Sequence, residues 1–135
     1  MAAVRIRGIW YLSLTVHADD VKSLPLRAGD ARLVVQKANR AGISGELHMG
    51  GETVPVVGKV KPGSPAVVTV FEANADGAIV PEGVEAMLYI PPWWPTVKYQ
   101  HDLITGTMII GSSSSVKSRE LAHKIILVSG IQPFE

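Results

Sequence analysis

Apolar residues alternate with other residues in eight stretches of the chain, which is the spacing of β-strands with one face turned to a core. The first stretch shows the pattern most fully, since Trp10 and Leu12 share one face while Tyr11 and Ser13 share the other. The predicted strands cover residues 4–17, 31–38, 43–49, 52–60, 66–73, 84–90, 99–111 and 119–131. In the last stretch residues 119–123 also fit a helical turn, but the run of Ile, Leu and Val that follows favours a strand.

The segments between these stretches have the composition of turns and loops. Gly50 and Gly51 predict a two-residue hairpin turn, whose backbone needs positive φ angles. Residues 18–30 are predicted to be a connecting loop, and the serines at residues 112–115 a flexible tip. Pro55 indicates an edge position or a bulge in the fourth strand, because proline cannot donate a hydrogen bond to a neighbouring strand. Gly106 indicates a bulge or bend in the seventh strand.

The short connections predict that successive strands lie side by side and run antiparallel. Strands in this order form a meander, which commonly closes so that the first strand pairs with the last and no edge is left. We therefore predict an all-β fold, an eight-stranded antiparallel up-and-down β-barrel, with a β-sandwich as the alternative. The length suits a single β-barrel domain over residues 1–135.

The composition narrows the possible functions. Hydrophobic residues make up 47% of the chain and charged residues only 19%, so we expect apolar surface that suits association, with a dimer as the homo-oligomer. The net charge of +1 argues against disorder and against a nucleic-acid-binding protein, which usually carries a basic surplus. The absence of cysteine excludes disulfides and thiolate chemistry. No apolar run is long enough to span a bilayer, and residues 8–16 resemble a mature strand more than a signal peptide. We therefore expect a cytoplasmic protein without a membrane partner.

No motif for a catalytic site or a bound cofactor stands out. Glu46 and His48 lie two residues apart on one predicted strand, so both point the same way. Inside a barrel they could act as an acid–base pair, whereas outside they would be an ordinary solvated pair, which is the commoner arrangement. Tyr99 and His101 are the other candidate catalytic residues. The spacing of the four histidines demands no metal site, and we expect no cofactor.

An aromatic loop follows the sixth predicted strand. Trp93 and Trp94 stand between prolines, and two adjacent indoles cannot easily both face a core. We expect the loop either to cap the core or to contact a ligand or another subunit. The candidate ligand-binding residues are Trp10, Tyr11, Tyr89, Trp93, Trp94 and Met108.

Short motifs in the chain resemble those of lipocalin-like (calycin) barrels. The Gly-Ile-Trp at 8–10 is similar to the G-x-W of the first lipocalin strand. The Ile-Ser-Gly-Glu at 43–46 and the Ile-Thr-Gly-Thr at 104–107 look like strand starts common in such barrels and in avidin-type ones. The second lipocalin motif and the biotin-contacting polar pattern of avidin are missing. The resemblance implies a barrel that holds a small, largely apolar molecule. Enzymatic barrels of the allene oxide cyclase type are similar at the same coarse level.

These observations leave three hypotheses for the function. The first is a barrel that binds a small apolar or aromatic molecule. The second is a cofactor-free enzyme, a cyclase or isomerase of natural-product tailoring type, whose dry cavity holds the substrate near its reactive conformation. The third is a structural or assembly module. Alternation alone does not say which face of each strand lines the interior, and that choice decides where any site lies.

Overall fold

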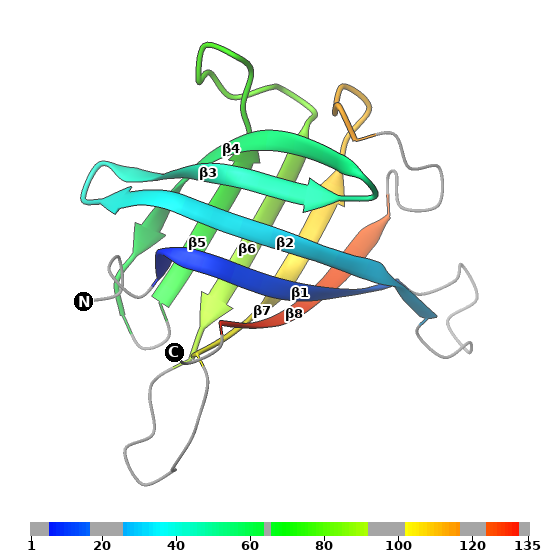
Figure 1. Cartoon of the computed structure of the whole chain (residues 1–135), viewed down its shortest axis with the longest axis horizontal. Coiled ribbons are helices and arrows are strands. Elements are labelled where there is room, and N and C mark those ends of the chain that lie inside the picture. Colours follow the sequence, from blue (N-terminus) through cyan, green and yellow to red (C-terminus); the bar gives the residue numbers. More distant parts are fainter. Residues whose placement is uncertain (1–5, 17–25, 64–65, 92–101, 117–123, 133–135) are drawn as a thin grey trace, which may run out of the picture.

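The computed structural model describes residues 6–16, 26–63, 66–91, 102–116 and 124–132. Its strands form one closed barrel, in which each strand pairs antiparallel with the next and the first pairs with the last (Figure 1). The strands are β1 (Gly8–Val16), β2 (Leu26–Asn39), β3 (Gly42–Met49), β4 (Glu52–Lys61), β5 (Ala66–Glu72), β6 (Val84–Ile90), β7 (Asp102–Ile110) and β8 (Ile125–Gln132). The predicted closed meander is confirmed, and the β-sandwich alternative is ruled out by the closure between β1 and β8.

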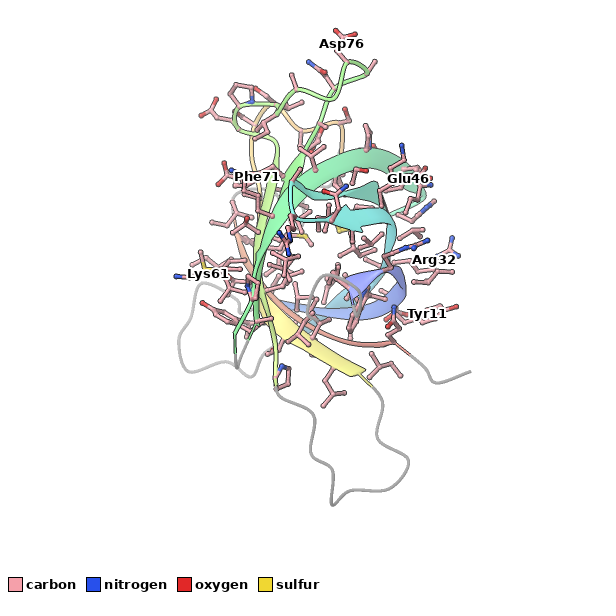
Figure 2. The ribbon with its side chains drawn as sticks, turned by 90° about the vertical axis from the view of Figure 1, so that its left-hand side faces the viewer. Tyr11, Arg32, Glu46, Lys61, Phe71 and Asp76 are labelled. Atoms are coloured by element: carbon pink, nitrogen blue, oxygen red, sulfur yellow. The ribbon has the colours of Figure 1, made fainter. Side chains whose placement is uncertain are left out.

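The apolar face of each strand lines the interior. Along β6 buried and exposed residues alternate without interruption, as the period of a strand requires. Large buried side chains such as Leu33, Leu47 and Leu88 meet there, and each contributes about 1.5–3 kcal/mol by leaving water. The faces that carry polar residues turn outwards. Figure 2 shows Tyr11 and Glu46 on the outer side of the ribbon, away from the interior.

The start of β1 is fixed by a buried indole. Trp10 is fully buried, and its Nε1–H donates to the carbonyl oxygen of Ile6 at 2.8 Å. Ile6 is also fully buried but lies outside the strand, which begins at Gly8. The predicted strand therefore began too early, and its residues 4, 5 and 17 lie outside the described residues.

β2 is longer than predicted. Residues 26–30, which we predicted to be loop, are strand and pair with the second half of β1 across a β-bulge at Leu14/Thr15. Gly29 has a φ of 125°, which side-chain-bearing residues rarely adopt. Glycine and aspartate are depleted in strands, so the local composition pointed to a loop. Pairing with β1 outweighs this preference and makes residues 26–30 a strand.

Pro55 lies at a local edge of β4 and not at a bulge. Residues 52–55 pair with β3 but have no partner on β5, and the β3–β4 register runs through Glu46↔Pro55 without a shift. Pro55 lies one residue beyond the β4–β5 ladder, which ends at Val56↔Glu72, and its carbonyl accepts the N–H of Ala73 at 2.8 Å. Its missing N–H falls past the end of that ladder, so no strand hydrogen bond is lost.

Gly106 is not a bulge either, because the registers of β7 with β6 and with β8 pass through it without a shift. A Cβ atom at this position would stand 2.1 Å from the carbonyl oxygen of Met87. Glycine is therefore needed here for the close approach of the β6 backbone.

The serine run after β7 is not a free tip. Ser114 is buried and its hydroxyl donates to Oε1 of Glu72 at 2.6 Å, while the N–H of Ser115 donates to Oε2 at 2.9 Å. The N–H of Val84 donates to Oε1 at 3.1 Å. Burial by itself would raise the pKa of Glu72, but these hydrogen bonds outweigh it and leave the pKa below its ordinary value. The buried carboxylate thus ties β5, the start of β6 and the serine run together.

Candidate functional site

One outward row of side chains crosses four strands. In the strand registers Tyr11 pairs with Arg32, and Arg32 pairs with His48. His48 pairs in turn with Thr53 across the β3–β4 hairpin. Directly opposite residues have Cβ atoms about 4.5–5.5 Å apart, so these side chains are neighbours. In Figure 2, Tyr11 and Arg32 project from the same side of the barrel.

This row borders an open hollow of about 710 Å³, which we call the β1–β4 groove. Its lining residues are Tyr11, Leu12, Ser13, Asp30, Ala31, Arg32, His48, Met49, Gly50, Gly51, Glu52 and Thr53. The groove forms where β2 runs on past β3, since their pairing ends at Ala31↔Met49 and residues 26–30 have no partner on β3. Gly50 and Gly51 turn the hairpin at this point, with φ angles of 63° and 81°, and place no side chain in the space.

The groove offers both flat apolar surface and hydrogen-bonding groups. Thr53 Oγ1 lies 3.0 Å from His48 Nδ1, and this hydrogen bond holds the orientation of the imidazole ring. Arg32 is exposed, and the carboxylates of Asp30 and Glu52 share the same lining, so the groove combines one guanidinium with two carboxylates. A ligand here could stack on Tyr11 and exchange hydrogen bonds with the guanidinium and imidazole groups.

A second hollow adjoins the first. It has a volume of about 470 Å³, lies over β7, β8 and β1, and shares Tyr11 and Ser13 with the β1–β4 groove. Its walls are more apolar, with Leu103 and Ile131 among them, and Gly130 leaves room between the side chains. The two hollows therefore meet at β1, where the more polar β1–β4 groove adjoins the more apolar hollow over β7 and β8.

A third hollow, the lysine hollow, lies over β2 to β5. It has a volume of about 540 Å³ and is lined by Lys37, Lys59, Phe71 and Ile79 among others. Figure 2 shows Phe71 on the side of the molecule opposite to Tyr11 and Arg32. This hollow is separate from the β1–β4 groove and shares no residue with it.

The structure divides the predicted ligand-binding residues between the core and the surface. Trp10 and Met108 are buried members of the core. Tyr11 lines the β1–β4 groove, and Tyr89 is exposed on the outside of β6, where its hydroxyl lies 3.3 Å from the sulfur of Met87. Trp93 and Trp94 lie outside the described residues.

The predicted catalytic residues are not brought together as a pair in the interior. Glu46 and His48 are half-buried on the outer face of β3. Glu46 Oε1 accepts a hydrogen bond from Nε2 of Gln36 at 2.9 Å, whereas His48 lines the groove. Tyr99 and His101 lie outside the described residues.

Sequence reasoning missed Arg32 and Thr53 as groove residues. Thr53 could have been found, because a two-residue turn at Gly50 and Gly51 sets the register that places it opposite His48. Arg32 could not, because its position beside Tyr11 depends on a pairing across the long β1–β2 connection.

Among the described residues, no three His, Asp or Glu side chains converge as a metal site would require. No helix in this part of the chain is long and apolar enough to cross a membrane. In comparisons with known proteins, no family model, curated protein or solved structure matches this chain. The closed barrel is compatible with a lipocalin-like architecture, and the site is argued from its own geometry.

Proposed function

We propose that this protein binds a small apolar or aromatic molecule that carries a polar group, and that the ligand lies in the β1–β4 groove. The observation that supports this most is the convergence of Tyr11, Arg32 and His48 on one open hollow of about 710 Å³. Pockets for small ligands usually have volumes of about 300–1,000 Å³ and combine apolar walls with a few polar groups.

The outer groove suits a ligand better than the interior of the barrel. The inward side chains of the described strands form one apolar cluster, which includes Trp10 and Met108. A ligand in the interior would have to displace such side chains, and losing the packing of one large core side chain costs about 2–5 kcal/mol. An open groove on the outer surface carries no such cost.

The groups in the groove indicate what kind of molecule fits. Tyr11 is 48% exposed and can stack on a flat ring without leaving its place. The guanidinium of Arg32 can stack on the same ring or pair with a carboxylate, and the His48 ring can hydrogen-bond a hydroxyl. Because Asp30 and Glu52 share the lining with Arg32, we expect weak selection for charge and stronger selection for an aromatic body.

Titrations with naphthalene-2-carboxylate and with neutral 2-naphthol test this proposal. Amide chemical shifts of the wild-type protein should move in a saturable way at Arg32, His48, Gly50 and Gly51. Truncation of an aromatic residue that anchors a ligand costs about 2 kcal/mol or more, so Tyr11→Ala should weaken binding by about thirty-fold or more.

Lys59→Ala is the matched control, because Lys59 lines the lysine hollow and not the β1–β4 groove. It should leave the affinity for both probes unchanged. The proposal fails if neither probe produces saturable shifts at the groove, or if the shifts persist in Tyr11→Ala and are lost in Lys59→Ala.

A cofactor-independent cyclase or isomerase is the second candidate. His48, held by its hydrogen bond to Thr53, could carry a proton to or from a molecule in the same groove. Turnover of a bound molecule by the wild-type protein that is lost in His48→Gln with unchanged affinity would favour an enzyme, whereas saturable binding without turnover in the wild type would favour simple binding. We also propose that the barrel is lipocalin-like, which the Gly-Ile-Trp at 8–10 supports. We propose a cytoplasmic location as well, which the lack of a long apolar run supports.

A further inference from the structure

The lysine hollow is lined by hydrogen-bond donors and apolar side chains, and none of its lining residues is acidic. Lys37 and Lys59 supply two ammonium groups, and both residues are exposed. Among the described residues neither of them has an ion-pair partner. The β1–β4 groove differs, because Asp30 and Glu52 line it together with Arg32. Two cations at one hollow without a carboxylate favour an anionic ligand there.

Short side chains between longer ones hollow out this part of the outer surface. Lys37 pairs with Ser44 across β2 and β3, and Ser44 pairs with Val57 across β3 and β4. Val57 pairs in turn with Phe71 on β5. The long side chains of this row stand at its two ends, while the shorter serine and valine lie between them. The row therefore has a cationic end on β2 and an apolar end on β5.

The donors gather around the start of β3. A Cβ atom at Gly42 would stand 4.0 Å from Cγ of Lys59, so the stem of this lysine runs beside a position that has no side chain. With about 4.8 Å between strands, Lys37 and Lys59 stand on strands roughly 10 Å apart, with β3 between them. Asn39 Oδ1 accepts the N–H of Ala41 at 2.8 Å, which leaves the side-chain NH2 of Asn39 to donate to a ligand. An anion over the start of β3 would therefore have donors on both sides.

The opposite end of the hollow is apolar. Phe71 is half-buried, and Ile79 lies close to the end of β5, where it pairs with Ala73. Ile79 is 52% exposed, so a ligand that covers it removes apolar surface from water.

Two carboxylates border the hollow from outside its lining. Glu85 pairs with Phe71 from β6, at the apolar end. Glu46 follows Ser44 by two residues on β3, and its Oε1 accepts a hydrogen bond from Nε2 of Gln36 at 2.9 Å. Neither side chain lines the cationic end, so an anion there meets the two lysines first.

We propose that the lysine hollow binds a phosphate monoester of a small apolar alcohol. The phosphate lies over the start of β3 between Lys37 and Lys59, and the apolar chain lies against Phe71 and Ile79. A phosphate monoester carries a charge of about −1.5 to −2 at neutral pH, which matches two ammonium groups. Lysine is a common partner of phosphate, as a compact point charge. The volume of about 540 Å³ is within the range of about 300–1,000 Å³ for small ligands. This site does not rest on the ligand proposed for the β1–β4 groove, because the two hollows share no residue.

Titration of the wild-type protein with hexyl phosphate, below the concentration at which it forms micelles, tests the proposal. Amide chemical shifts should move in a saturable way at Gly42, Ser44 and Gly58, which line the hollow. The amides of Gly50 and Gly51 report separately on the β1–β4 groove. Inorganic phosphate lacks the apolar chain and 1-hexanol lacks the charge. Each should bind about ten-fold more weakly than hexyl phosphate, or weaker still, because each can use only one end of the hollow.

Three variants and one control assign the binding to this hollow. Lys37→Gln and Lys59→Gln should each weaken the binding of hexyl phosphate by about five-fold or more. Ile79→Ser should weaken the binding of hexyl phosphate and leave that of inorganic phosphate unchanged, because it alters only the apolar end. Lys61→Gln is the matched control, since Lys61 is exposed on the same strand as Lys59 and lies outside the lining, on the same side of the barrel as Phe71 (Figure 2). At an ionic strength of about 0.15 M its charge is largely screened beyond about 8 Å, so the affinity should change by less than about two-fold. Circular dichroism of each variant checks that the barrel is intact.

Three results would overturn the proposal. The first is a titration with hexyl phosphate that produces no saturable shifts at Gly42, Ser44 and Gly58. The second is an affinity that Lys61→Gln weakens as much as Lys59→Gln does, since the attraction would then come from the general charge of this side. The third is a wild-type protein that binds inorganic phosphate or 1-hexanol as tightly as hexyl phosphate, since one end of the hollow would then be unused. None of these results depends on whether the naphthalene probes bind in the β1–β4 groove.

Discussion

Replacing Glu72 with glutamine changes one buried acceptor atom, Oε2, into an amide NH2 group, which donates. In the wild-type protein Oε2 accepts the N–H of Ser115 at 2.9 Å, and the substitution would set two donors against each other. Oε1 would keep the Ser114 hydroxyl and the Val84 N–H, but as a neutral acceptor. A hydrogen bond to a charged group contributes about 1.5–3 kcal/mol, so losing one and weakening two should cost about 2–4 kcal/mol. For a chain of this length that corresponds to a fall of roughly 6–20 °C in Tm.

The pH dependence of this loss follows from the pKa of Glu72, which lies below its ordinary value because the three hydrogen bonds outweigh the effect of burial. A carboxyl whose folded-state pKa is lowered adds stability above its unfolded-state pKa, about 4.3 for glutamate, and this contribution is lost as the pH falls through the folded-state pKa. The Glu72→Gln variant has no such proton to gain. The difference between the two proteins should therefore be constant at neutral pH and should shrink below about pH 4.3.

Urea unfolding of both proteins, followed by circular dichroism at several pH values, measures the difference. Glu82→Gln is the matched control, because Glu82 is exposed and its contact with the Ser112 hydroxyl, at 3.3 Å, lies in solvent. It should cost less than about 1 kcal/mol. The reasoning is refuted if Glu72→Gln is as stable as the wild type at pH 7. It is equally refuted if the stability of the wild type relative to the variant increases as the pH falls from 7 to 5, because Glu72 would then take up a proton on folding.

Three further substitutions test the packing of the barrel, each measured by urea unfolding. Trp10→Phe removes the hydrogen bond to the Ile6 carbonyl and leaves space in the core, so it should cost about 2–4 kcal/mol, and a cost below about 1 kcal/mol would contradict the buried position. Gly106→Ala forces a Cβ against the Met87 carbonyl oxygen and should cost more than about 3 kcal/mol or prevent folding, whereas a neutral effect would rule out the close approach. Gly51→Ala meets open space and pays only for its positive φ, so it should cost about 1 kcal/mol, clearly less than Gly106→Ala.

The strands and their closure could be predicted because the signal is local and repeated. Alternation in residues 84–90 predicts β6 at the bounds that the structure gives, since every second side chain there is buried. The predicted turn at Gly50 and Gly51 is confirmed, and its signal is also local, because two adjacent glycines readily adopt the positive φ angles that the turn requires. Closure between β1 and β8 followed from the order of the strands and from the cost of an open edge.

Three errors fall where a distant part of the chain decides the local structure. Residues 26–30 look like a loop until β1 pairs with them. Ser114 looks like part of a mobile tip until the carboxylate of Glu72, far away in the sequence, enters the same space. Gly106 looks like a bulge until the backbone of β6 approaches it. These contacts cannot be predicted from the hydrophobic period or from the structural preferences of single residues.

The site was harder to predict than the fold, because alternation fixes which residues share a face but not which face is inside. Tyr11 and His48 were candidates on a polar face, and the structure places them on the outer surface of neighbouring parts of the barrel. Trp10 was also a candidate ligand-binding residue, but the structure buries its side chain in the core. A large aromatic residue on the apolar face of a strand is therefore a weaker sign of a ligand site than one on the polar face.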